Sequence, residues 1–152
     1  MEVHEGGCLC GDIRYRVRGK ALRALACHCR FCQRRTGSAF AIETFFLQEN
    51  VEFAGRPAAS YQHTSVESGR WLRLDFCPRC GTNLGAEAEL RPGQYIVSGG
   101  TFDDPDWLDV GMHIWTQSKR RWVVLSEGSE RYEKGTQPTR PSEPMPPDAT
   151  GA

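Results

Sequence analysis

The sequence predicts a mainly β fold, and three observations support this class. Apolar and charged residues alternate from Ile13 to Val17, which places Ile13, Tyr15 and Val17 on one face of a half-buried strand. Short apolar or aromatic runs recur between glycines and prolines, as in proteins built from short strands. No segment carries a sustained helical period. With 152 residues and 39% hydrophobic content, the chain can bury roughly 70% of its unfolded surface as one domain.

The remaining elements follow from the same periodicities. Leu72, Leu74 and Phe76 repeat the alternation of the first strand, and further strands are expected within residues 39–47, 94–98 and 112–116. A turn of helix is expected at residues 29–36. The run over residues 44–53 does not distinguish strand from helix.

The last part of the chain differs in composition from the rest. Residues 136–152 read TQPTRPSEPMPPDATGA and hold five of the nine prolines but no large aromatic residue. Such a segment cannot bury enough apolar surface to offset the entropy lost on ordering. We therefore expect a zinc-binding domain over residues 1–135, for the reasons below, and a disordered proline-rich tail over residues 136–152.

Charge and terminal patterns limit the classes of partner. Lysine plus arginine equals aspartate plus glutamate at 19 each, so no net field favours nucleic acid or an anionic membrane. The first residues, MEVHEGG, lack the pattern of a secretory signal, and no apolar run approaches a membrane span. These features predict a cytoplasmic protein. In that reducing compartment, clustered cysteines are metal ligands or catalytic groups more often than disulfides.

The spacing of the seven cysteines predicts a closed metal site. Cys77 and Cys80 lie in CPRCG, a turn in which two thiolates can converge as in a zinc knuckle. Cys8 and Cys10 lie two residues apart beside the first strand, where they would share one face. Together these four cysteines would complete a tetrahedral structural zinc site that holds the fold. The alternative is a set of buried or disulfide-linked cysteine pairs.

The other three cysteines form a compact triad. Cys27, Cys29 and Cys32 lie in CHCRFC and offer three ligands without a fourth cysteine, the pattern of a reactive zinc site with an open position. An exogenous thiolate suits that position, because zinc lowers the pKa of a bound thiol. We expect two zinc ions per chain, the second more easily lost. A different partition, with CLC and CHC on one ion and Cys32 with CPRC on another, splits the triad. The triad could also be redox-sensitive thiols without a metal.

Basic residues surround the triad. Arg30, Arg34 and Arg35 could offset the charge of the thiolates and attract carboxylates, of which glutathione carries two. They could equally form a solvated basic edge. His28 between two of the cysteines fits a packed or an exposed neighbour better than a ligand.

Five segments together resemble a known family. In order they are GGCLCGDIRY, ACHCRFCQRRTGSAF, FCPRCGTNL, SGGTFDDP and HIWTQSKRRW. They resemble the glutathione-dependent formaldehyde-activating enzyme family, which also includes centromere protein V, over residues 6–133. The resemblance implies a β-tent type of fold, in which small coiled β-sheets surround zinc. It also implies structural ligands at Cys8, Cys10, Cys77 and Cys80 and a catalytic zinc at Cys27, Cys29 and Cys32.

The resemblance further implies a carbon–sulfur lyase of the S-(hydroxymethyl)glutathione synthase type. Such an enzyme joins a thiol such as glutathione to a small aldehyde such as formaldehyde. The sequence offers no convincing general base, and His113, Trp115 and Trp122 fit core or wall positions better than catalytic ones. The competing hypothesis is a non-enzymatic zinc module that binds a partner or senses thiol oxidation. Neither hypothesis includes a nucleic-acid or membrane partner.

Overall fold

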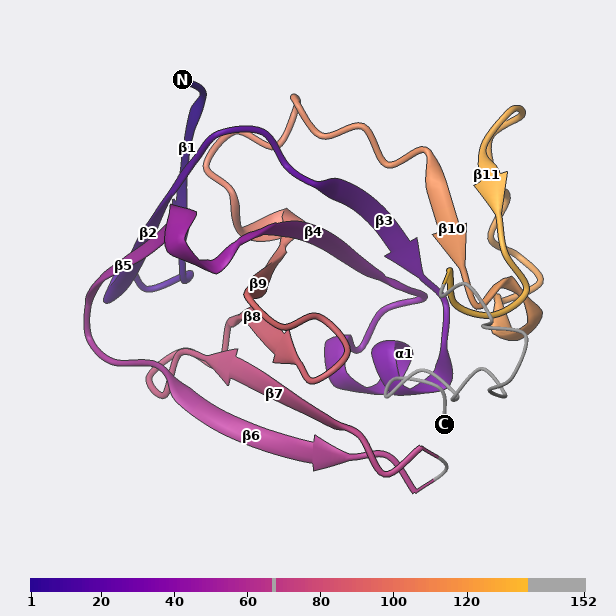
Figure 1. Ribbon diagram of the computed structural model, residues 1–152, viewed down its shortest axis with the longest axis horizontal. Coiled ribbons are helices and arrows are strands. Elements are labelled where there is room, and N and C mark those ends of the chain that lie inside the picture. Colours follow the sequence, from indigo (N-terminus) through magenta and orange to yellow (C-terminus); the bar gives the residue numbers. More distant parts are fainter. Residues whose placement is uncertain (67, 137–152) are drawn as a thin grey trace.

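The computed structural model describes residues 1–66 and 68–136 and has two β-sheets. The prediction of a mainly β protein is confirmed, whereas the predicted disorder of the proline-rich tail concerns residues that lie, except for Thr136, outside the described part. The smaller sheet has the order β1-β2-β5, formed by Val3–Gly7, Ile13–Arg18 and Val51–Gly55. All its pairings are antiparallel. It lies at one side of the molecule, beside the N-terminus (Figure 1).

The larger sheet has the order β11-β10-β3-β4-β9-β8-β7-β6. Most of its pairings are antiparallel, but β10 runs parallel to both β3 and β11. In sheet order its strands are Glu130–Arg131, Met112–Ile114, Arg23–Cys27, Ala41–Leu47, Gln94–Ser98, Asn83–Ala88, Trp71–Phe76 and Ala59–Thr64.

In the part of the chain that the structure describes, four short helical segments connect the strands. The α-helix α1 (Arg30–Thr36) follows β3 directly, so the end of that strand and the start of the helix form one turn. The three 3₁₀ segments are η1 (Gln48–Asn50), η2 (Gly99–Thr101) and η3 (Thr116–Ser118). Among the described residues, no helix is both long enough and apolar enough to cross a membrane.

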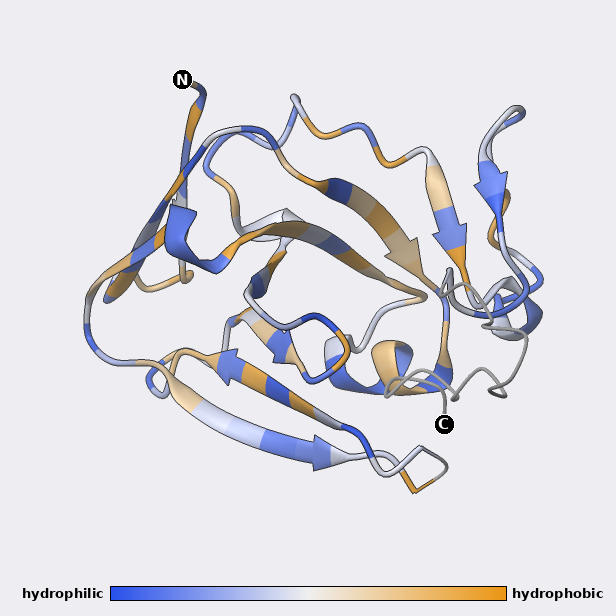
Figure 2. Cartoon of the chain, viewed as in Figure 1, coloured by the Kyte–Doolittle hydropathy of each residue, from blue (hydrophilic) through white to orange (hydrophobic). Residues whose placement is uncertain are grey.

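The alternation of the sequence places side chains as expected on the central strands. In β2, Ile13, Tyr15 and Val17 are almost fully buried. Apolar and polar residues also alternate along β7, as Figure 2 shows by its alternating orange and blue bands. Apolar side chains gather into two core clusters, and each of the clusters contains cysteines. The cores are therefore built around the groups that could bind metal.

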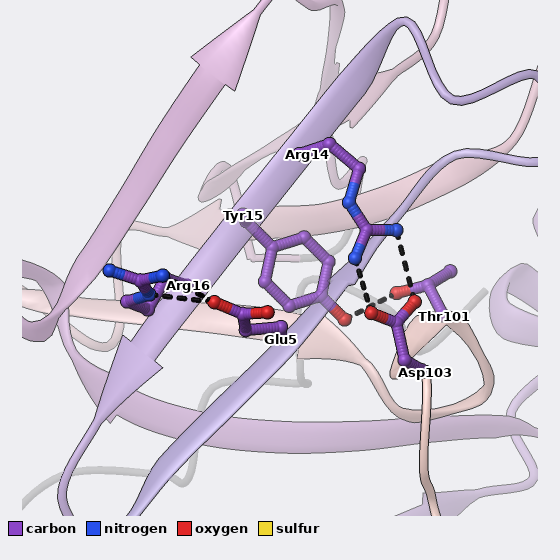
Figure 3. Close-up of polar contacts among 6 residues, drawn as sticks. All are labelled: Glu5, Arg14, Tyr15, Arg16, Thr101 and Asp103. Atoms are coloured by element: carbon purple, nitrogen blue, oxygen red, sulfur yellow. Dashed lines mark hydrogen bonds and ion pairs between the residues drawn. The ribbon is translucent and has the colours of Figure 1, made fainter.

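Polar contacts fix the small sheet to the loop after β9. Arg14 pairs with Asp103 through two hydrogen bonds, and the Tyr15 hydroxyl lies 2.9 Å from Thr101 Oγ1 (Figure 3). On the neighbouring strand Glu5 accepts from the Arg16 guanidinium. Because Tyr15 is buried, its bond to Thr101 satisfies a hydroxyl that would otherwise be costly to remove from water.

A buried carboxylate connects β6, β7 and β9. Asp75 is 7% exposed and accepts from Ser60 Oγ at 2.6 Å and from the Tyr95 hydroxyl at 2.9 Å. Burial, together with the negative charge of Asp75, raises the pKa of Tyr95 above its usual range. The folded protein therefore favours the protonated phenol.

We expect Tyr95→Phe to lower the free energy of unfolding by about 1.5–3 kcal/mol, the range for a hydrogen bond to a charged group. Urea denaturation at pH 7 measures this loss. Because the folded pKa is raised, the contribution of Tyr95 is complete below about pH 10 and decreases as pH rises beyond the unfolded value. The difference between wild type and variant should therefore shrink above pH 10. A difference that grows with alkaline pH would contradict this assignment.

Several strands lie in segments that were not predicted to be strands. The strands β2, β4, β7 and β9 match the predicted segments, and α1 matches the predicted helical turn. The segment predicted as a strand at residues 112–116 is a strand only to Ile114, because Trp115 adopts the left-handed conformation and begins a 3₁₀ turn. The strands β1, β3, β6, β8 and β11 were not anticipated.

Candidate metal centres

Four cysteines from two distant turns converge on one point. The sulfurs of Cys8, Cys10, Cys77 and Cys80 all lie within 4.8 Å of one another. Cys10 Sγ lies 3.5 Å from Cys8 Sγ and 3.8 Å from Cys77 Sγ. The first pair follows β1 and the second follows β7, so the cluster connects the small sheet to the large one.

The two pairs lie on tight turns closed by glycine. The N–H of Gly11 donates to the carbonyl of Cys8, and the N–H of Gly81 donates to the carbonyl of Cys77. Both glycines have positive φ, which a residue with a side chain would adopt only with strain. The expectation that Cys8 and Cys10 share the face of a strand is wrong. The chain reverses between β1 and β2, and this turn brings the two sulfurs together.

The spacing of the four sulfurs fits a tetrahedral zinc ion. A zinc–sulfur distance of about 2.3 Å implies sulfur–sulfur distances of about 3.8 Å in a tetrahedron. The separations of 3.5 and 3.8 Å agree with that value. The sulfurs are also soft donors of the kind that zinc prefers. The four cysteines could therefore hold a zinc ion.

The electrostatics of this cluster differ from one sulfur to the next. The hydroxyl and backbone N–H of Thr82 lower the pKa of Cys80 to about 5. The backbone of Asp12 lowers the pKa of Cys10, but burial and the three neighbouring sulfurs outweigh it and raise the value to about 12. Four thiols this close cannot all ionise without a cation between them. A bound metal ion would supply that positive charge.

The second cluster lies where β3 passes into α1. The sulfurs of Cys27, Cys29 and Cys32 lie within 4.8 Å of one another, and all three residues are buried. Cys29 is the N-cap of α1, and its sulfur accepts from the N–H of Cys32 at 3.2 Å. Cys32 therefore lies with Cys27 and Cys29, as the first partition of the cysteines predicted. No fourth histidine, cysteine, aspartate or glutamate of residues 1–66 or 68–136 joins this group.

Comparison with known proteins agrees with these two clusters. The family model described as "Glutathione-dependent formaldehyde-activating enzyme" matches residues 3–118, which include all seven cysteines. The chain belongs to this family. A solved structure of a Rhodobacter sphaeroides protein is similar in fold, with a TM-score of 0.54 and 23% identity. The match covers 70% of the present chain and 96% of the other.

In this member of the family, a buried ion pair lies beside the triad. Arg35 Nη2 lies 2.7 Å from Glu43 Oε1, and the two side chains are only 7% and 8% exposed. Glu43 Oε1 also lies 3.7 Å from Cys32 Sγ. Burial raises the pKa of Cys32 to about 12, and the charge of Arg35 partly opposes this increase. The guanidinium therefore offsets the negative charge of Glu43 and would do the same for Cys32 if its sulfur were a thiolate, the role expected for an arginine beside the triad.

Two further buried side chains, Gln33 and His28, lie in the same part of the chain as the triad. Gln33 Nε2 donates to the carbonyls of His28 and Ser118, which ties α1 to η3. His28 Nε2 lies 3.0 Å from His113 Nδ1, and burial lowers the pKa of His28 to about 4. His28 is thus a packed neutral neighbour, as expected. Sequence reasoning missed Gln33, since a glutamine on a short helix carries no signal of burial.

A cavity of about 800 Å³ lies against the outer side of α1. Arg30, Arg34 and Arg35 line it from the helix. The opposite wall comes from β6, β7 and the residues after the second cysteine pair. The three arginines predicted near the triad therefore share one hollow, although Arg35 is already paired with Glu43.

The aromatic residues late in the chain occupy different environments. Trp115 is 6% exposed and packs in the same core cluster as the triad, as expected for a core residue. Trp122 is 70% exposed, so its expected place in the core or a wall is wrong. It lies in a segment without regular strand pairing and belongs to neither core cluster.

Proposed function

We propose that the protein is a zinc-dependent carbon–sulfur lyase of the S-(hydroxymethyl)glutathione synthase type, which joins a thiol such as glutathione to a small aldehyde. The observation that carries this proposal is the triad of Cys27, Cys29 and Cys32, three converging sulfurs without a fourth donor among the described residues. A site with three protein ligands leaves room for a ligand from the substrate. Family membership supports the same reaction class.

The triad and the residues around it have distinct tasks in this proposal. Cys27, Cys29 and Cys32 would hold a zinc ion, which supplies a Lewis acid that stabilises a substrate thiol as thiolate. Arg35 balances the charge of the sulfurs through its contact with Cys32. Leu25, Ile114 and Trp115 pack in the same cluster and keep water from the sulfurs. In the balanced reaction a sulfur–carbon bond forms, and the thiol proton ends on the former carbonyl oxygen.

The four-cysteine cluster has a structural task, with zinc at Cys8, Cys10, Cys77 and Cys80. We propose a reducing compartment such as the cytoplasm, because all seven cysteines are free thiols. A second candidate function is a zinc module without catalysis. The burial of the triad favours it, because closed sites with buried ligands commonly serve structure.

The decisive measurement is the rate of hemithioacetal formation from glutathione and formaldehyde, followed by NMR exchange and corrected for the uncatalysed reaction. We expect Cys29→Ser to reduce the enzyme-dependent rate at least about 100-fold, within the range for loss of a catalytic group. Its zinc content should fall from two ions per chain to one, while circular dichroism stays unchanged. Arg121→Gln, an exposed site outside the cavity, is the control and should retain both activity and metal. A wild-type rate equal to the uncatalysed rate would favour the module.

A further inference from the structure

The cavity beside α1 combines charge and aromatic surface in a way that selects one class of ligand. Among the residues that the structure describes, its lining includes three arginines and one histidine but no aspartate or glutamate. Arg34 has no ion-pair or hydrogen-bond partner among residues 1–66 and 68–136, and Arg30 contacts only the neutral amide oxygen of Gln33. Two guanidinium groups thus face the cavity without a counter-charge. An anion is the complementary ligand, and a carboxylate matches the planar guanidinium best.

The remaining wall is mostly apolar. Phe31 from α1 and His63 from β6 lie with ring centroids 4.4 Å apart and form a continuous aromatic surface. Tyr61, Leu74 and Phe76 extend this surface along β6 and β7. Tyr61 is 60% exposed, so most of its ring is open to a ligand. A flat apolar body would gain contact here, whereas a peptide backbone would lose hydrogen bonds to water with few replacements.

The cavity also adjoins the triad. Phe31 lies between Cys29 and Cys32 on the chain and packs against the core cluster that contains them. Arg35 both lines the cavity and acts on Cys32 through its charge. The volume of about 800 Å³ falls in the range of small-molecule sites and exceeds that of a single aromatic ring. A ring and part of a second reactant could therefore occupy it together.

We propose that this cavity binds an aromatic carboxylate, with the carboxylate on Arg30 and Arg34 and the ring against Phe31, Tyr61 and Phe76. The aldehyde substrate then belongs to the same class, as an aromatic aldehyde that carries a carboxylate. This assignment of the substrate, unlike the binding of the carboxylate, rests on the proposed function. In that reaction the thiol sulfur bonds to the aldehyde carbon, and the thiol proton moves to the aldehyde oxygen. The aromatic carboxylate itself stays unchanged.

Binding is tested on the full-length zinc-loaded protein without any reaction. Isothermal titration calorimetry with 4-(hydroxymethyl)benzoate should give saturable binding, and both benzyl alcohol and acetate should bind at least about tenfold more weakly. Arg34→Gln should weaken 4-(hydroxymethyl)benzoate about tenfold and leave benzyl alcohol unaffected, since only the charged contact is lost. Arg121→Gln is the matched control and should bind as wild type. The proposal would be overturned if benzyl alcohol bound as tightly as 4-(hydroxymethyl)benzoate, or if Arg34→Gln bound 4-(hydroxymethyl)benzoate as tightly as wild type. Tighter binding of glutathione at the same arginines would also overturn it.

A kinetic comparison tests whether the substrate is an aromatic aldehyde that carries a carboxylate. With glutathione as thiol, kcat/KM for 4-formylbenzoate should exceed that for benzaldehyde. Arg34→Gln should remove most of this preference, whereas Arg121→Gln, outside the cavity, should keep it. If the carboxylate binds but no aldehyde reacts faster than in buffer, the proposed function fails and the binding site stands. If catalysis occurs without any preference for the carboxylate, the substrate assignment fails and the proposed function stands.

Discussion

Replacing Cys77 by serine is expected to abolish cooperative folding. Cys77 is fully buried in the core cluster that joins the two sheets, and its sulfur lies 3.8 Å from Cys10 Sγ. Structural zinc in small peptides contributes about 10 kcal/mol or more of apparent binding free energy. A whole domain is stable by only about 5–15 kcal/mol. Loss of one ligand therefore removes stabilisation of the same size as the total.

Circular dichroism, urea denaturation and metal content measure this effect together. Wild type should show a cooperative transition that disappears with a strong chelator and returns when zinc is restored. Cys77→Ser should lack the cooperative transition as prepared, with the chelator and after zinc is added. Cys29→Ser is the matched control, because the triad closes a loop of only a few residues, whereas Cys10 and Cys77 are 67 positions apart. A Cys77→Ser protein with the wild-type midpoint would contradict a structural role for this cluster.

The second large effect is expected at the buried ion pair. Arg35→Leu should lower the free energy of unfolding by about 3–5 kcal/mol, because it removes the positive charge that pairs with the buried Glu43 carboxylate. The remaining carboxylate would also face Cys32 at 3.7 Å, which adds repulsion when that sulfur is a thiolate. The loss of Arg35 should therefore weaken the metal affinity of the triad as well.

A double variant separates the cost of the orphaned charge from the loss of packing. Arg35→Leu combined with Glu43→Leu should recover most of the lost stability, since a buried pair replaced by apolar residues is often neutral. Arg34→Leu is the control on the adjacent exposed position and should change stability by no more than about 0.5 kcal/mol. Urea denaturation of the three variants provides the comparison. If Arg35→Leu alone lowered the free energy of unfolding by less than about 1 kcal/mol, water would have to reach Glu43 in that variant, and the predicted large effect would be wrong.

The sequence predicted the two cysteine clusters better than it predicted the sheet. Ligand spacing in CHCRFC and CPRCG reports on local turns, and both turns have the geometry that those residues favour. The strand β6 escaped prediction because ASYQHT lies at the edge of the sheet, where most of its side chains are exposed and no alternation is needed. In β1, VHEGG contains two glycines and resembles a loop, and only its pairing with β2 makes it a strand.

The site features that the sequence did not predict depend on tertiary contacts between separate elements. Arg35 was recognised as basic, but its partner Glu43 comes from β4, after the chain has turned back beside α1. The bond from Gln33 to Ser118 spans 85 positions. The cavity likewise needs β6 and β7 opposite the helix. Local patterns carry no information on such pairings, because tertiary packing alone creates them.

The parallel strand β10 has a consequence for how the protein is made. Its Ile114 pairs with Cys27 of the triad, and the segment after it bonds to Tyr132 and Lys134. On the ribosome, the four-cysteine cluster has all its ligands once residue 80 has emerged, whereas the strand that supports the triad is synthesised more than thirty residues later. The four-cysteine cluster can therefore assemble before the strand that supports the triad has been synthesised.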